Sequence, residues 1–102
     1  GKKRLPYDLV IQEEYVKLAM KFEYFDKAIS LCEEKIASLK RKEYWYFLLA
    51  TAQAKAGKKE EALENLSNAS KSIEKLSRNH KSTSYIIGLR DKILQLQKLL
   101  DH

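Results

Sequence analysis

Apolar residues recur every three or four positions in five stretches of the chain, and this spacing is typical of amphipathic helices. The expected helices cover residues 7–22, 25–39, 43–56, 59–76 and 82–100, with a turn at 77–80 before the last one. The second stretch carries its apolar stripe at Phe25, Ala28, Ile29, Cys32, Ile36 and Leu39. The pattern predicts an all-α fold of five helices.

The third stretch differs because residues 44–49, Tyr-Trp-Tyr-Phe-Leu-Leu, are apolar on every side of a helix. A strand is an alternative for so short a run, but Ala50, Ala52, Ala54 and Ala56 follow without a break and favour a helix. A helix that is apolar all round must be covered on several sides. We therefore expect residues 43–56 to form the central element.

Composition agrees with a helical chain of one domain, residues 1–102. The only proline is Pro6, so no proline interrupts a helix after it, and there are just three glycines. Gly57 stands where a left-handed residue would end the third helix. Gly88 lies inside the fifth expected helix at a cost of about 1 kcal/mol relative to alanine. We expect a neighbour to pack closely against it.

A local pattern repeats after 34 residues. The segment Phe25-Asp26-Lys27-Ala28-Ile29 recurs as Lys59-Glu60-Glu61-Ala62-Leu63, and a helix-length stretch follows each copy. A period of this length is typical of repeated helical hairpins that stack side by side.

The pattern resembles the tetratricopeptide repeat, a 34-residue pair of antiparallel helices. Residues 43–76 carry the clearest copy, on Tyr46, Leu49-Ala50, Gly57, Ala62, Leu66 and Ala69. Residues 9–42 form a second copy in which Glu23 replaces the turn glycine. In the clear copy, Gln53 replaces a tyrosine. The Ile87-Gly88 pair lies 38 residues after Leu49-Ala50, so residues 82–101 resemble either the first helix of a third repeat or a terminal capping helix.

This resemblance implies a right-handed superhelix of about two hairpins plus a C-terminal helix, whose first helices line a concave groove. Groove positions would carry the residues that bind a partner protein or peptide: Glu13, Lys17, Met20, Lys21, Tyr44, Phe47, Thr51 and Lys55. Tyr44 and Phe47 offer aromatic area for anchoring a peptide. Alternatively, the fifth helix or the N-terminal segment covers these two rings. Lys17 and Leu48 stand where some relatives have asparagines that clamp an acidic C-terminal tail, so we predict no clamp of that type.

The fifth expected helix carries more apolar residues than one packing face needs. Its excess predicts either packing on two sides or a self-association face formed by Ile86, Leu89, Ile93, Leu96 and Leu100. An unoccupied docking face for a further repeat is the same possibility with a different occupant.

Net charge is +6, and the lysines are scattered along every expected helix. A solvated surface explains most of them. Binding of RNA is a weaker alternative, because basic and aromatic residues alternate only around Lys42-Glu43-Tyr44.

Enzyme chemistry is not indicated. The two histidines, His80 and His102, lie far from the single Cys32 in the expected layout, and no metal-binding or phosphate-binding motif occurs. We therefore expect no catalytic residues, no metal and no cofactor.

The expected function is a protein-interaction module, with a scaffold or oligomerisation fragment of a longer repeat protein as the alternative. No membrane-spanning segment or signal peptide is visible, and with one cysteine this favours the cytoplasm. Because Gly1 stands where an initiator Met is expected, the chain is interpreted as an excised fragment.

Overall fold

A computed structural model describes residues 7–101, and the side chains of residues 11–79 and 81–101. Five long helices and one single-turn helix make up this part of the chain, and it contains no strand. They are α1 (Tyr7–Lys21), α2 (Phe25–Ser38), α3 (Glu43–Lys55), α4 (Lys59–Glu74), α5 (Arg78–Lys81) and α6 (Ser84–Leu100). The prediction of an all-α fold is confirmed. The short helix α5 replaces the turn that we expected at residues 77–80.

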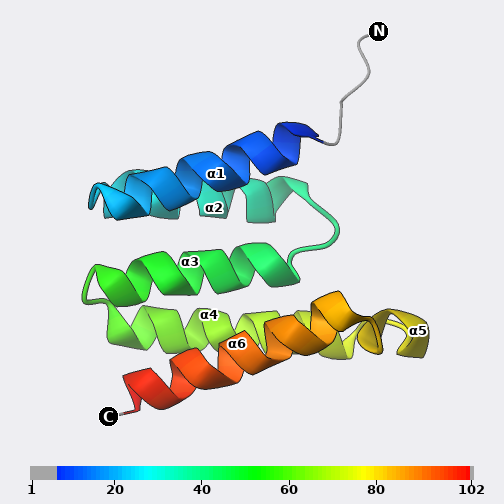
Figure 1. Ribbon diagram of the computed structural model, residues 1–102. Coiled ribbons are helices and arrows are strands. Elements are labelled where there is room, and N and C mark those ends of the chain that lie inside the picture. The colour runs from blue at the N-terminus through cyan, green and yellow to red at the C-terminus, as the bar shows by residue number, and fades with distance from the viewer. Residues whose placement is uncertain (1–6, 102) are drawn as a thin grey trace, which may run out of the picture.

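The helices α1 and α2 form one antiparallel hairpin, and α3 and α4 form a second one beside it (Figure 1). The two hairpins close with the same turn. Glu23 and Gly57, 34 residues apart, both adopt left-handed backbone, with φ of 66° and 83°. After each of them, the next backbone N–H donates to the carbonyl five residues earlier at 2.8 Å. This pair of features ends a helix by satisfying its free carbonyls.

The helix α3 is the central element, as its all-round apolar sequence predicts. It packs against α1, α2, α4 and α6. One core cluster lies among α1, α2 and α3 and consists of Val16, Ala19, Ala28, Ile29, Cys32, Trp45, Leu48, Leu49 and Ala52. The other lies among α3, α4 and α6 and consists of Ala50, Ala62, Leu66, Ala69, Ile73, Ile86, Leu89 and Ile93. The opposite sides of α3 therefore supply both clusters.

Small residues occupy the contact between α3 and α4. Ala50 and Ala62 are fully buried in the same cluster. Without larger side chains between them, the two helix backbones can approach closely. Gln53 is also buried there, and its carbonyl oxygen accepts a hydrogen bond from the side chain of Asn65 at 2.9 Å. This polar pair occupies the position at which the resemblance leads one to expect a tyrosine.

Two expectations about α6 need correction. A Cβ atom added to Gly88 would meet nothing within 4 Å, so no neighbour packs closely against this glycine. Three residues of the expected self-association face, Ile86, Leu89 and Ile93, are 1–3% exposed because they pack against α3 and α4. Leu96 and Leu100 are partly buried against the same cluster.

The first helix also differs from its expected role. Ile11, Tyr15, Leu18 and Phe22 are 49–59% exposed, although they are large and apolar. The core contacts of α1 come instead from Val16, Ala19 and Met20. One face of α1 is therefore apolar and uncovered by the described part of the chain.

Cys32 packs as a small apolar residue, as expected. It is fully buried in the first cluster, and burial together with the nearby Glu33 raises the pKa of its thiol to about 12. Among the described residues, no helix is both long and apolar enough to cross a membrane.

Candidate functional site

An open pocket lies where the middle of α1 meets the first turns of α3 and α6. Its volume is about 450 Å³. The lining residues are Glu13, Leu39, Arg41, Glu43, Tyr44, Trp45 and Tyr85. Four of these side chains are large and apolar or aromatic, and three are charged. Pockets of this size and mixed character are suited to holding one large side chain of a ligand.

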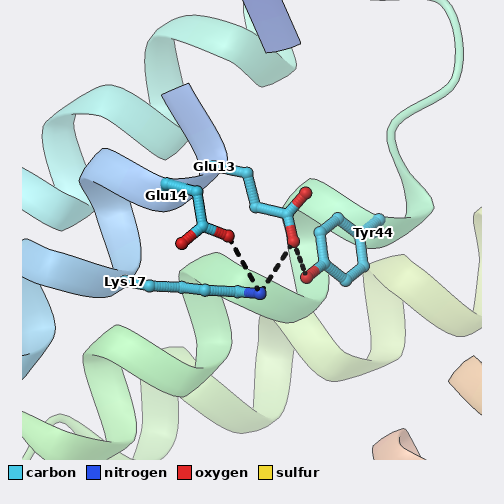
Figure 2. Close-up of polar contacts among 4 residues, drawn as sticks. All are labelled: Glu13, Glu14, Lys17 and Tyr44. Carbon is cyan, nitrogen blue, oxygen red and sulfur yellow. Dashed lines mark hydrogen bonds and ion pairs between the residues drawn. The ribbon is translucent and has the colours of Figure 1, made fainter. Parts of the chain in front are cut away.

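A polar network joins α1 to α3 at one wall of the pocket (Figure 2). The Tyr44 hydroxyl donates a hydrogen bond to the Glu13 carboxylate at 2.6 Å. The Lys17 ammonium lies 3.0 Å from the same carboxylate oxygen and 3.8 Å from the carboxylate of Glu14. The hydrogen bond from Tyr44 links residues 31 positions apart, so it fixes the first hairpin relative to the second.

The protonation behaviour of Glu13 follows from these contacts. Partial burial raises the pKa of this carboxyl, but the hydrogen bond from Tyr44 and the contact with Lys17 lower it by more. Lys92 of α6 adds a smaller electrostatic contribution in the same direction. The net result is a pKa below the ordinary value of 4.5, so Glu13 is ionised at neutral pH.

The second wall is aromatic. The Tyr44 ring lies 6.4 Å from the Phe47 ring and 6.4 Å from the Tyr85 ring, tilted in both cases. Burial, followed by the hydrogen bond to Glu13, raises the pKa of Tyr44 well above its ordinary value. Burial, followed by the charge of Glu43, raises the pKa of Tyr85. Both phenols are therefore neutral at physiological pH, and Tyr85 keeps 54% of its surface exposed.

An ion pair forms the floor at the entry to α3. Glu43 is 3% exposed, and its carboxylate accepts from Arg41 Nε at 2.8 Å and from Nη2 at 2.6 Å. This two-pronged contact compensates the burial of the carboxylate. Arg41 is half exposed, so its outer edge faces the pocket and solvent.

Three of the eight residues that we expected in the groove come together here: Glu13, Lys17 and Tyr44. Glu13 and Tyr44 line the pocket, and the half-exposed Lys17 lies beside them. Their convergence is what the resemblance implied for first helices that line one face.

The other five lie outside the pocket lining. Phe47 and Met20 are partly buried and pack against the second and first core clusters. The Thr51 hydroxyl donates to the Phe47 carbonyl at 2.9 Å. Lys21 and Lys55 are exposed. The aromatic area expected of Phe47 is thus largely used within the fold, and Tyr85 covers part of Tyr44.

Sequence reasoning missed Tyr85, Arg41 and Glu43. A signal for Tyr85 did exist, because the 38-residue offset between Leu49-Ala50 and Ile87-Gly88 carries Phe47 onto Tyr85. No comparable signal marks Arg41 or Glu43, since their pairing depends on how residues 39–42 connect α2 to α3.

Within the described residues, no group of three or more His, Cys, Asp or Glu side chains is arranged to hold a metal ion. Comparison of the chain with protein-family models, with curated proteins and with solved structures gave no match.

Proposed function

We propose that this chain is a non-catalytic protein-interaction module that binds a peptide or helix of a partner protein on the face shared by α1, α3 and α6. The observation that carries the proposal is the pocket at Tyr44 and Tyr85, where three helices meet. The pocket combines exposed aromatic area with fixed charges, and such anchoring sites dominate binding energy at protein interfaces.

We further propose that the helices stack in the manner of tetratricopeptide repeats. Two observations support this arrangement. The hairpin turns at Glu23 and Gly57 have the same backbone and hydrogen bonds, 34 residues apart. In addition, α3 contacts both α1 and α6, so every second helix lies beside the next one, as neighbouring first helices of a repeat array do.

The chemistry of the pocket favours a segment with one bulky apolar side chain as the ligand. Leu39, Trp45 and the two tyrosine rings supply the apolar walls, and Glu13 is already paired with Lys17 and Tyr44. Because these polar groups are satisfied, an apolar side chain can enter without leaving a buried charge unpaired. The exposed lysines on the same helices, Lys17 and Lys21, favour acidic residues flanking the anchor.

A selection from a displayed peptide library tests the proposal, because it needs no chosen partner. Immobilised protein is expected to enrich peptides that share a large apolar residue. Their affinities are then measured by fluorescence anisotropy for the wild type, Tyr85→Ala and Tyr24→Ala. Tyr24 is the matched control, because it is 62% exposed in the turn between α1 and α2 and does not line the pocket.

Tyr85→Ala is expected to weaken binding at least about tenfold, since exposed aromatic anchors typically contribute more than 1 kcal/mol. Tyr24→Ala is expected to leave binding unchanged. If the selection enriches nothing, or if the enriched peptides bind Tyr85→Ala as tightly as the wild type, the assignment of the pocket is wrong.

A further inference from the structure

The exposed apolar face of α1 has the spacing of a helix-pairing seam. Ile11, Tyr15, Leu18 and Phe22 are separated by four, three and four residues. At 100° per residue they fall within a strip about 60° wide, and so narrow a strip is typical of coiled-coil contacts rather than of a helix lying on a globular core. We call these four residues the α1 stripe.

The α1 stripe is distinct from both surfaces that α1 already uses. Val16 and Ala19 face the first core cluster. Glu13 and Lys17 face the pocket shared with α3 and α6. The stripe points away from α3, at the edge of the layered arrangement where α1 is the outermost helix (Figure 1). A groove of about 380 Å³ continues from Tyr15 onto α2, where it is lined by Leu31 and Ser30 among others.

We propose that the α1 stripe is a homodimer interface, in which a second copy of this chain packs its own α1 antiparallel against the first. In this register, Ile11 faces Phe22 of the second copy, and Tyr15 faces Leu18 of the second copy. A two-fold axis generates each contact twice, as isologous dimers require.

The charges beside the α1 stripe favour this register. Glu14 and Lys21 flank the stripe on one side, and both are exposed. In an antiparallel pair with Tyr15 opposite Leu18, Glu14 of one copy comes opposite Lys21 of the other, twice by symmetry. The other side carries Gln12 and Ala19, so no like charges meet there. In a parallel pair, by contrast, Glu14 would come opposite the uncharged Ala19.

The buried area is adequate for a weak dimer. The four side chains are 49–59% exposed. At about 200 Å² for a large exposed side chain, two copies remove on the order of 900 Å² from water before the flanking residues are counted. Specific interfaces begin near this size, and the smallest ones are transient. We therefore expect an equilibrium between monomer and dimer that depends on protein concentration.

Sedimentation equilibrium up to about 1 mM protein tests the proposal, because a weak pair with a dissociation constant below that concentration is populated there. The wild type is expected to approach the mass of two chains. Leu18→Glu puts two charges at the centre of the contact and is expected to raise the dissociation constant at least about 30-fold. Ile87→Glu on α6 is the control, since Ile87 is 53% exposed on a different helix, and is expected to have no effect.

Charge reversal tests the register. Glu14→Lys and Lys21→Glu each bring like charges together and are expected to weaken the dimer about tenfold, whereas the double variant restores the pairs and is expected to come within about threefold of the wild type. Circular dichroism and the fluorescence of the buried Trp45 verify that each variant is folded.

Several outcomes would overturn the proposal. A monomer at about 1 mM would mean that the α1 stripe binds a different protein segment. A dimer that survives Leu18→Glu uses another surface. Species larger than a dimer that are lost in both Leu18→Glu and Ile87→Glu indicate head-to-tail association. Single charge variants without effect exclude the antiparallel register. None of these results bears on the pocket at Tyr85, because that pocket lies on another face of α1.

Discussion

Asn65→Ala is expected to destabilise the protein through a residue that it does not itself remove. Asn65 Nδ2 donates to Gln53 Oε1 at 2.9 Å across the contact between α3 and α4. Gln53 is only 6% exposed, so water has little access to the carbonyl once its donor is gone. A buried polar group left without a partner costs about 1–3 kcal/mol.

The net effect is smaller than that range because Ala is a better helix former than Asn by roughly 0.5 kcal/mol. We therefore expect Asn65→Ala to lower the free energy of unfolding by about 1–2 kcal/mol. For a domain of this size, each kcal/mol corresponds to a decrease of about 4–8 °C in Tm. Urea unfolding followed by the fluorescence of Trp45, the only tryptophan and 5% exposed in α3, measures the change.

The double variant separates the hydrogen bond from the other effects of the substitution. Gln53→Leu removes the buried acceptor, so Asn65→Ala in that background leaves no orphaned carbonyl at residue 53. We expect the cost of Asn65→Ala to fall by about 1 kcal/mol there. Asn68→Ala is the control, because Asn68 donates to Asn65 at 3.2 Å without contacting Gln53, and we expect a change below about 0.5 kcal/mol. If Asn65→Ala costs the same whether residue 53 is Gln or Leu, the pair contributes nothing to stability.

Three further substitutions test other parts of the structure. Glu23→Gly is expected to raise the free energy of unfolding by about 1 kcal/mol, because Glu23 holds the left-handed backbone that glycine adopts without strain; thermal unfolding that shows no gain would contradict this interpretation of the turn. Gly88→Ala is expected to stabilise by about 1 kcal/mol through helix propensity, since a Cβ there meets nothing within 4 Å; a loss of stability would mean that the site is crowded after all. Glu13→Gln is expected to reduce the acid sensitivity of the fold. Because the pKa of Glu13 is lowered from 4.5, the stability that it contributes is fully present above that pH and is lost as pH falls through the folded-state pKa. Urea midpoints measured from pH 6 downward should therefore differ most between wild type and Glu13→Gln above pH about 4.5 and converge below it, with the exposed Glu34→Gln as the control.

The helices could be predicted because their signals are local. Spacing of apolar residues located five of them, and the position of Gly57 located a turn. The all-round apolar run at residues 44–49 also identified the central helix, since covering such a helix needs neighbours on several sides. The 34-residue period correctly indicated that Glu23 and Gly57 occupy equivalent positions, although only one of them is a glycine.

The site could be predicted only in part, because it depends on which helices meet. Glu13 and Tyr44 were expected on a common face, and their hydrogen bond at 2.6 Å places them together. Phe47 was expected to face a partner, but its ring packs against the second core cluster. Which neighbour covers a given apolar side chain is a property of the assembled fold, and periodicity along one helix carries no information about it.

The same reasoning explains why α1 has two apolar surfaces. A helix within a stack is covered on both sides by neighbours, so its sequence needs two apolar strips, whereas a terminal helix needs only the strip that faces inward. The inward strip of α1 consists of small and medium residues such as Val16 and Ala19, while its outward strip carries Tyr15, Leu18 and Phe22. A helix that carries larger apolar residues outward than inward is built to be covered on that side. Loss of dimerisation in Leu18→Glu with an unchanged fold would identify a second copy of α1 as that cover.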